Sequence, residues 1–324
     1  MSPNTYILNL YEYRNNRRKG NVGEHVGNVF AQYKPLLLDK EEIDITNEQN
    51  VRKVLREENA TVIINAAAYT NVDAAEEQKE AAFLVNETGV KNLGSVAKEL
   101  SATLVHFSTD YVFPGTSEDG YSETDSPGPA VNEYGNSKLA GERALKESGC
   151  NFYLVRTAWL YGSNGKNFVD TMLQLAQTKK NLSVVEDQVG SPTFTKDVAL
   201  YIKTLIEEHY PFGIYHAVNS GKASWFEFAQ KIFEYMRSLA VVVKPVSSAE
   251  FPRPAKRPAF SILQNTKGPQ MRAWLCRLGG CGPSSTRPPR ASSSSPAWKR
   301  WPARPGIQEG LLAGTPLTPR AGAR

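Results

Sequence analysis

Tyr134 and Lys138 are the residues whose types and spacing most clearly suggest chemistry. They stand four positions apart in a stretch expected to be helical, so the phenol and the ammonium would lie on one face about one turn apart. A tyrosine ionises near pH 10 and is a poor acid or base until a nearby cation stabilises its phenolate. Lys138 is placed to do that. The alternative is a chance pair on an exposed helix, which the spacing alone does not exclude.

A group of hydroxyl residues stands upstream of this pair. Ser108 closes a predicted buried strand, and Thr109, Asp110 and Tyr111 follow it directly. A serine or threonine at this position could hydrogen-bond a carbonyl group that is being reduced. Together with Tyr134, these hydroxyls indicate proton delivery to a carbonyl oxygen.

The elements that would position these residues alternate along the chain. Between Pro35 and about Tyr210, short apolar runs alternate with longer amphipathic stretches, which is typical of βαβ units feeding a parallel sheet. The predicted strands are Leu36–Asp39, Thr61–Asn65, Leu104–Ser108 and Tyr153–Arg156. The predicted helices are Glu48–Glu58, Ala74–Leu100, Glu133–Ser148, Phe168–Gln177, Thr195–Tyr210 and Ser224–Met236, with Asp44 or Thr46 capping the first and Ser224 the last. Ligands of such sheets bind beyond the carboxyl ends of the strands.

Charge is unevenly distributed along the chain. The formal charge is +5, yet residues 268–324 alone hold eight arginines, one lysine and one glutamate, which leaves the remainder mildly acidic. This tail shows no sustained apolar period, so we expect it to be mostly unpacked. Its basic residues could give salt-sensitive binding to nucleic acid. The stacked aromatic residues and folded modules of a specific nucleic-acid binder are missing, so we disfavour nucleic acid as a partner.

Composition narrows the class of protein further. With 324 residues, of which 40% are hydrophobic, the chain can form one large or two ordinary domains, and collagen-like, coiled-coil and fully disordered classes are excluded. Cys150 is the single cysteine before the tail, which suits a reducing compartment. Neither a stretch of roughly 20 apolar residues nor a signal peptide occurs. We therefore expect a cytoplasmic protein without membrane contact.

Five motifs occur in an order that resembles the dTDP-4-dehydrorhamnose reductases, which belong to the extended short-chain dehydrogenase/reductase superfamily. They are Asn65–Thr70, Ser108–Phe113, Tyr134–Lys138, Arg156–Gly162 and Asp187–Thr193, with Lys256–Pro258 as a weaker sixth. The resemblance extends from about Pro35 to Lys267. Together with the alternation of apolar runs and amphipathic stretches, it predicts an α/β fold with a doubly wound, Rossmann-like parallel sheet. We expect an NAD(P)-binding region over 1–160, the remaining sheet elements and a smaller substrate-binding subdomain over 161–267, and a disordered tail over 268–324.

The resemblance implies roles for the Tyr134–Lys138 pair and for the hydroxyl residues upstream of it. It makes Tyr134 the proton donor, Lys138 its activator and a ligand of the cofactor ribose, and Thr109 with Ser108 the hydroxyls that orient the carbonyl. It also places Ala66, Ala67 and Tyr69 along the cofactor and Asn86 facing the cofactor cleft. The alternatives are a tight turn for the first three and a helix-surface position for Asn86.

On the substrate side, the resemblance points to Tyr111, Trp159 and Arg257. Trp159 would wall the sugar site, with ordinary core packing as the alternative. Arg257 could offer its guanidinium fork to the nucleotide diphosphate, whereas an arginine beside prolines is more often a solvated loop residue. The stretch Asp187–Thr193 would form a substrate-side loop.

The N-terminal region departs from the family pattern Thr-Gly-x-x-Gly-x-x-Gly. The nearest register puts Gly20 and Gly23 on the second and third glycines, with Arg17 in place of the first. The strand implied by this register, Tyr11–Asn16, is polar, and the more strand-like Tyr6–Leu10 lies further upstream. Glycine lets backbone N–H groups reach the pyrophosphate of the cofactor. We therefore expect a degenerate first strand and turn, and weak cofactor binding, unless the charge of Arg17 attracts phosphate.

The function that the resemblance implies is reduction of the 4-keto group of dTDP-4-dehydro-L-rhamnose to dTDP-L-rhamnose by NADPH or NADH. Asp39 could accept from a ribose 2′-hydroxyl and repel a 2′-phosphate, whereas Lys40 could do the opposite. No residue is assigned as a metal ligand, and Mg²⁺ dependence and a homodimer stay open. The alternative is a non-catalytic relative acting as a regulatory subunit, similar to the β subunit of methionine adenosyltransferase; retention of Tyr134 and Lys138 favours catalysis.

Overall fold

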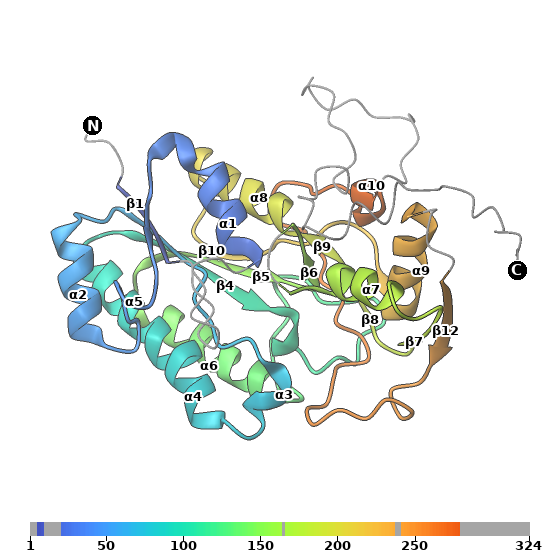
Figure 1. Ribbon diagram of the computed structural model, residues 1–324. Helices are drawn as coiled ribbons and strands as arrows, with labels where there is room; N and C mark the ends of the chain where they lie inside the picture. Colours follow the sequence, from blue (N-terminus) through green and yellow to red (C-terminus); the bar gives the residue numbers. More distant parts are fainter. Residues whose placement is uncertain (1–4, 10–20, 164–165, 237–240, 279–324) are drawn as a thin grey trace, which may run out of the picture.

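A six-stranded parallel sheet lies at the centre of the computed structural model, which describes residues 5–9, 21–163, 166–236 and 241–278 (Figure 1). The strand order is β10-β5-β4-β3-β1-β2. The strands are β1 (Tyr6–Asn9), β2 (Leu36–Leu38), β3 (Val62–Asn65), β4 (Thr103–Thr109), β5 (Asn151–Thr157) and β10 (Gly213–His216). The order reverses between β1 and β3, and the carboxyl ends on either side of this point frame the ligand crevice of doubly wound folds. The predicted fold class is confirmed.

Helices cover both faces of the sheet, as Figure 1 shows. On one face lie α1 (Asn21–Val29) and α8 (Thr195–Glu207), and on the other α2 (Glu48–Glu57), α5 (Gly89–Glu99) and α6 (Glu133–Ser148). Successive side chains of a strand point to opposite faces. Ile63 accordingly packs in the core beneath α2 and α5, while Ile64 packs in the core beneath α1 and α8. Burial on both faces explains why the strands are apolar runs.

Helix α6, which carries Tyr134 and Lys138, begins and ends at the predicted residues. The side chain of Asn132 caps its first turn by accepting from the Gly135 N–H, and Gly149 ends it with a positive φ of 67°. The cap of α2 was predicted wrongly: Asn47, rather than Asp44 or Thr46, accepts from the first turn. Ser224 caps α9 (Trp225–Met236) as expected, because its hydroxyl accepts from the Glu227 N–H.

The long helix predicted over Ala74–Leu100 is interrupted at residues 76–78 and contains a π-helical turn, so the chain forms four consecutive elements there. They are α3 (Val72–Ala75), α4 (Lys79–Phe83), the π-helical turn η2 (Leu84–Thr88) and α5. The π turn presents Asn86, whose buried amide hydrogen-bonds the backbone of Tyr69 on a separate loop. A long-range contact of this kind leaves no trace in the local periodicity, and π turns often mark such positions.

The smaller subdomain is built mainly from short paired strands and two helices. Its strand pairs are β6 (Leu160–Tyr161) with β9 (Thr193–Phe194), β7 (Asn181–Val185) with β12 (Val242–Val246), and β8 (Val189–Gly190) with β11 (Ala223–Ser224); its main helices are α7 (Phe168–Ala176) and α9. Phe228 and Ile232 of α9 are buried in its core. Two short 3₁₀ turns also occur in the described residues, η1 (Ala31–Tyr33) and η3 (Asp110–Val112). Within the described ranges, no helix is both long and apolar enough to cross a bilayer.

Both ends of the described chain differ from expectation. The first strand is the apolar Tyr6–Asn9, paired between β2 and β3, whereas residues 10–20, including Arg17 and Gly20, lie outside the described residues. The segment after Gly268 forms α10 (Trp274–Leu278), where Trp274 is buried and Arg277 pairs with Asp197. The expectation of an unpacked tail is therefore wrong as far as Leu278. Residues 279–324 also lie outside the described residues.

Candidate active site

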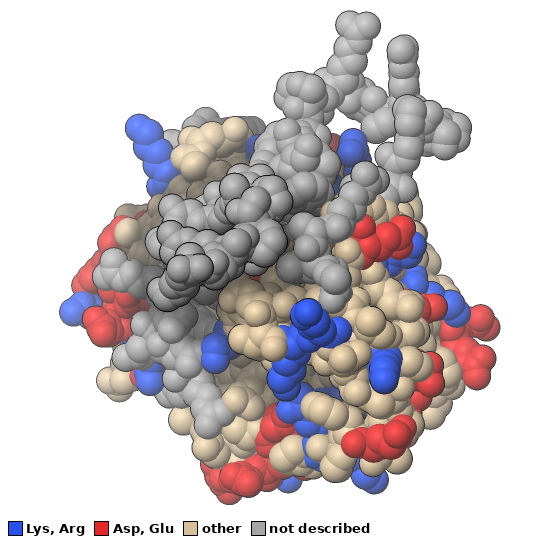
Figure 2. Space-filling model, turned by 45° about the vertical axis from the view of Figure 1, so that its right-hand side comes forward, with Lys and Arg blue, Asp and Glu red and all other residues tan. Residues whose placement is uncertain are grey.

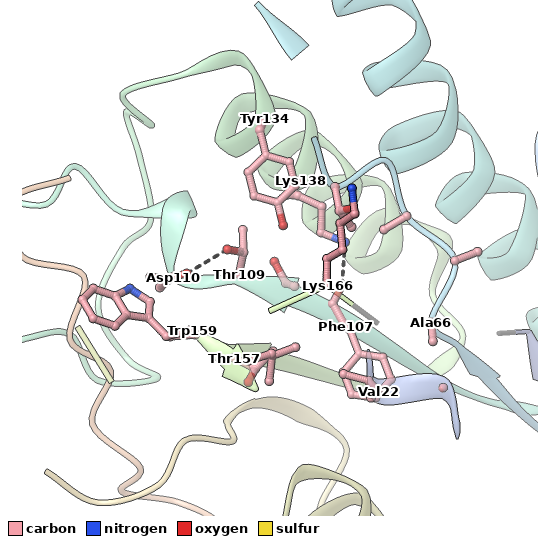
Figure 3. A pocket seen from close by; sticks show the side chains of 17 residues that line it. Val22, Ala66, Phe107, Thr109, Asp110, Tyr134, Lys138, Thr157, Trp159 and Lys166 are labelled. Atoms are coloured by element: carbon pink, nitrogen blue, oxygen red, sulfur yellow. Dashed lines mark hydrogen bonds between the residues drawn. The ribbon is translucent and has the colours of Figure 1, made fainter. Parts of the chain in front are cut away.

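A cavity of about 380 Å³ lies at the carboxyl ends of the central strands (Figure 3). It brings together the start of α1, the loop after β3, the ends of β4 and β5, and one face of α6. Its lining residues are Val22, Gly23, Ala66–Ala68, Thr70, Phe107–Asp110, Tyr134, Lys138, Thr157–Leu160 and Lys166. This is the edge at which ligands of doubly wound sheets bind.

Tyr134 and Lys138 both face this cavity from consecutive turns of α6. Figure 3 shows the phenol pointing into the space between Thr109 and Lys138. Gly135 allows α6 to come this close, because a methyl group at this position would overlap the carbonyl oxygen of Tyr111. The structure thus brings Tyr134, Lys138 and Thr109, three of the four residues with a predicted catalytic role, to one cavity.

Lys138 is held in a buried position. Its side chain is 2% exposed, and Nζ donates to the carbonyl oxygen of Phe107 over 2.6 Å. Burial lowers the pKa of the Lys138 ammonium to about 8. Its charge therefore changes over a pH range close to neutrality.

Thr109 faces the same cavity from the end of β4. Its hydroxyl donates to Asp110 Oδ1 over 2.9 Å and accepts from the Tyr111 N–H over 3.2 Å. Burial raises the pKa of the Asp110 carboxyl to about 6. The Thr109 hydroxyl must therefore turn away from Asp110 before it can donate to a ligand.

Ser108 makes a hydrogen bond within the protein. Its hydroxyl donates to Glu142 Oε1 over 2.6 Å, and Glu142 also accepts two hydrogen bonds from Arg156 over 2.8 and 2.7 Å. Glu142 and Arg156 are both 0% exposed. Ser108 lines the cavity, but its hydroxyl would have to leave Glu142 before it could donate to a carbonyl. Its expected carbonyl-orienting role stays a prediction.

The residues predicted along the cofactor divide into two groups. Ala66 and Ala67 line the cavity, where their small side chains leave room for a close approach, and Gly23 lines it from α1. Tyr69 does not line it: its ring is buried in the core and its hydroxyl donates to Gln78 Oε1 over 3.0 Å. For the two alanines the turn and cofactor interpretations stay compatible, and their cofactor contact stays a prediction.

Asn86 and Asp39 also lie away from the cavity lining. Asn86 is buried, and its side-chain amide hydrogen-bonds Tyr69 and Ser137, so it ties the loop that carries Tyr69 to α6. Asp39 follows β2, and its Oδ1 accepts from the Glu41 N–H over 3.0 Å. The expected cofactor contacts of Tyr69, Asn86 and Asp39 stay predictions.

Trp159 lines the cavity that holds Tyr134 and Lys138 and also a neighbouring one. It has a positive φ of 45°, and its ring stacks on that of Trp225 with centroids 3.4 Å apart and an interplanar angle of 1°. Gly190 leaves space for this ring, because any side chain at this position would overlap it. Both tryptophans line a neighbouring cavity of about 350 Å³, which they share with Tyr111 and Tyr134.

A third cavity, of about 650 Å³, continues past Tyr111 and Trp225. Three cationic residues line it, namely Lys179, Arg253 and Arg257. Arg257 is not a solvated loop residue: it is largely buried, and Nη1 donates to Asp73 Oδ1 and to the Ala255 carbonyl oxygen, each over 2.6 Å. One arm of its guanidinium is therefore already engaged within the protein.

Several lining residues were missed by the sequence analysis, among them Thr157 and Lys166 in the first cavity and Trp225 in the two neighbouring ones. Trp225 begins α9, where an aromatic residue is usually interpreted as core. The buried Thr157 Oγ1 has no hydrogen-bond partner among the described residues and follows Arg156 within a motif that was singled out. Lys166 extends across the cavity in the view of Figure 3. For Thr157, the signal was its place at the carboxyl end of β5, opposite Thr109.

The fold and this site together define a short-chain dehydrogenase/reductase. Residues 18–275 match the family model described as RmlD substrate binding domain. A dTDP-4-dehydrorhamnose reductase of Mycolicibacterium smegmatis is 40% identical over 256 residues, covering 77% of this chain and 78% of the relative. The chain therefore belongs to the dTDP-4-dehydrorhamnose reductase family.

Further relatives agree with this assignment. The dTDP-4-dehydrorhamnose reductase of Escherichia coli is 38% identical over 233 residues, covering 69% of this chain and 78% of that protein. A crystal structure of dTDP-4-dehydrorhamnose reductase from Bacillus anthracis in complex with NADP superposes with a TM-score of 0.80 at 39% identity, covering 85% of this chain and 98% of that chain. The sequence resemblance is thus confirmed over the fold as well as the motifs.

Proposed function

We propose that this chain reduces the 4-keto group of dTDP-4-dehydro-L-rhamnose to give dTDP-L-rhamnose. The observation that carries the proposal is the convergence of Tyr134, Lys138 and Thr109 on one cavity at the carboxyl edge of a doubly wound sheet. The named relatives support the choice of substrate. No observation favours the regulatory-subunit alternative.

The residues present fit a nicotinamide cofactor. Gly23, Ala66 and Ala67 leave room for a dinucleotide beside the N-terminus of α1, and the unpartnered Thr157 hydroxyl offers a donor within the cavity. When bound, the reduced cofactor supplies a hydride to C4 of the sugar. Tyr134 then donates its phenolic proton to the C4 oxygen, Lys138 stabilises the resulting phenolate, and Thr109 hydrogen-bonds the same oxygen.

We infer NADPH as the reductant, with support from the relative that was solved in complex with NADP. No group of three or more His, Cys, Asp or Glu side chains suited to a metal ion occurs among the described residues, and no observation supports a role for Mg²⁺.

The cationic cavity beside the site suits the diphosphate of the substrate. Lys179, Arg253 and Arg257 line it, and Figure 2 shows basic side chains gathered near the middle of this side of the molecule, with acidic ones toward the rim. Arginine and lysine recognise phosphate oxygens through charge-assisted hydrogen bonds. Tyr111 and Trp225 stand between this cavity and Tyr134, which suits a sugar held between them. A homodimer and a cytoplasmic location stay predictions.

The test of the function is direct. Purified protein is mixed with NADPH and dTDP-4-dehydro-L-rhamnose, and the nicotinamide absorbance is followed, with NADH and a substrate-free sample in parallel. We expect loss of absorbance that depends on the sugar nucleotide and is faster with NADPH. Unchanged absorbance with a folded protein that binds NADPH would contradict the proposal.

Trp225→Ala should raise KM for the sugar nucleotide by about three- to tenfold while kcat changes little. The reason is that the stacked partner ring holds Trp159 against the sugar site, and aromatic pairs contribute roughly 0.5–1.5 kcal/mol. Steady-state kinetics measures both constants. Trp225→Phe, which keeps a stacking ring, is the matched control and should lie near the unaltered protein; equal losses in both variants would show that stacking is not the reason.

Replacing residues 10–20 by a turn with the family pattern Thr-Gly-x-x-Gly-x-x-Gly should tighten NADPH binding by about ten- to a hundredfold. Each regained hydrogen bond to a charged phosphate contributes roughly 1.5–3 kcal/mol. Titration of cofactor fluorescence measures the dissociation constant. Deleting residues 279–324 is the control and should leave it unchanged. Equally tight binding by the unaltered chain would show that Arg17 and its neighbours already form a working phosphate site.

A further inference from the structure

His106 lies behind Lys138 and has no part in the reaction as described so far. It belongs to β4 and is 1% exposed. Its Nε2 stands 3.5 Å from Nζ of Lys138, on the β4 strand whose Phe107 carbonyl accepts from the same ammonium. A titratable ring this close to the activating lysine calls for an account of its protonation.

Asn65 fixes the tautomer of this ring. Asn65 is 0% exposed and pairs with His106 across β3 and β4. Its Oδ1 accepts from the Ala67 N–H over 3.1 Å, which leaves Nδ2 as the atom 3.1 Å from Nδ1 of His106. An amide nitrogen can only donate, so Nδ1 must accept. The neutral ring therefore carries its proton on Nε2, the atom that faces Lys138.

This arrangement opposes a charged Lys138. Burial and the nearby lysine both hold the pKa of His106 well below its usual range, so the ring is neutral at physiological pH. An ammonium has only donors and gains nothing from a facing N–H, whereas a neutral amine has a lone pair that accepts from it. The hydrogen bond from Nε2 is thus available only when Lys138 has released its proton.

The other titratable groups around Lys138 do not replace this effect. On α6, Tyr134 precedes it by one turn. Glu142 follows by one turn, and although its carboxylate is hydrogen-bonded to Arg156 and Ser108, its charge raises the pKa of Lys138 and so acts in the opposite direction. Across the cavity stand Asp110 and Lys166. Among the described groups that contact the Lys138 ammonium, His106 is the one whose donor faces it at a fixed position.

We propose that His106 is a positioning residue which, in the tautomer fixed by Asn65, sets the proton affinity of Lys138 and hence the pH at which the Tyr134–Lys138 pair works. Its kinetic consequence rests on the proposed reduction. The tautomer of His106 and the proton affinity of Lys138 are properties of the cofactor-free protein. Experiments can therefore refute this proposal without refuting the proposed reduction, and the reverse.

The first test uses the unaltered protein without substrate. ¹⁵N NMR of labelled histidine, with His106 assigned by loss of its signals in His106→Phe, reports which ring nitrogen bears the proton. We expect an unprotonated Nδ1 and a protonated Nε2 between pH 6 and about 9. A proton on Nδ1 over this range would overturn the proposal.

The second test changes the tautomer. In Asn65→Asp a carboxylate accepts from Nδ1–H, so Nε2 becomes an acceptor for the Lys138 ammonium. ¹³C NMR titration of labelled lysine, assigned with Lys138→Met, should show the pKa of Lys138 rising by about one unit or more. In the His106→Phe background, the same substitution acts only through its charge and should shift this pKa much less. Equal shifts in both backgrounds, or none, would overturn the proposal.

Discussion

Tyr134→Phe should lower kcat by about two to four orders of magnitude, the usual range for a positioned proton donor. The phenol points into the cavity between Thr109 and Lys138, and its hydroxyl is the atom lost in this variant. The packing of the ring, including its edge contact with Tyr111 at 5.8 Å between centroids, stays available. We therefore expect nearly unchanged NADPH affinity, which separates loss of proton transfer from loss of structure.

The matched control for this variant is Tyr111→Phe. Tyr111 lines the adjoining cavities but not the one that holds Lys138, so removing its hydroxyl should affect KM for the sugar nucleotide more than kcat. Steady-state kinetics with both variants, together with circular dichroism to verify folding, provides the comparison. Nearly normal turnover by a folded Tyr134→Phe protein would refute the assigned mechanism.

Lys138→Met should lower kcat/KM by about a hundredfold or more and change its pH dependence. The ammonium, with a pKa of about 8, loses its charge as the pH rises through that value, and the phenolate of Tyr134 then loses its stabilising cation. Without Lys138 the phenol keeps its proton to higher pH, so the remaining activity should persist further into the alkaline range. Cofactor binding should weaken as well, because a charge-assisted hydrogen bond to the ribose is lost.

The control for this second variant is Lys166→Met, which removes the other lysine that lines the cavity. It should leave the position of the alkaline limb unchanged. Profiles of kcat/KM against pH and fluorescence titrations with NADPH measure both properties. A loss of rate in Lys138→Met with the pH profile and the NADPH affinity unaltered would make Lys138 a structural residue only.

Local patterns predicted the elements that carry the site. The apolar runs that became β3, β4 and β5 stood out because both of their faces are buried, and α6 was delimited by Asn132 and Gly149 at its ends. β10 has the same length as β3 but contains Gly213 and His216 and is fully buried at only two of its four positions, so it forms no apolar run. The two-residue strands of the smaller subdomain are too short to show a period. The position of β1 was missed because the glycine register pointed to the polar stretch that follows it.

Within the site, the sequence identified residues but not the partners of their hydrogen bonds. Tyr134, Lys138 and Thr109 meet because parallel strands end at one edge of the sheet. Whether Ser108 offers its proton to a ligand depends on Glu142, 34 positions away, and the orientation of the Arg257 guanidinium depends on Asp73, 184 positions away. Asn86 likewise serves a loop 17 residues upstream. Contacts at these separations follow from the fold and not from any local pattern.

Transfer of deuterium to the sugar tests the central claim most directly. The protein is incubated with dTDP-4-dehydro-L-rhamnose and NADPH that carries deuterium at C4 of the nicotinamide. Two separate runs are made, each with the deuterium in one of the two positions on that carbon, and the product is examined by NMR and mass spectrometry. The account predicts dTDP-L-rhamnose with deuterium at C4 of the sugar from one of the two labelled forms, and no such product with Tyr134→Phe over the same time. Recovery of the unreduced ketone, with both labelled cofactors intact and bound to a folded protein, would contradict it.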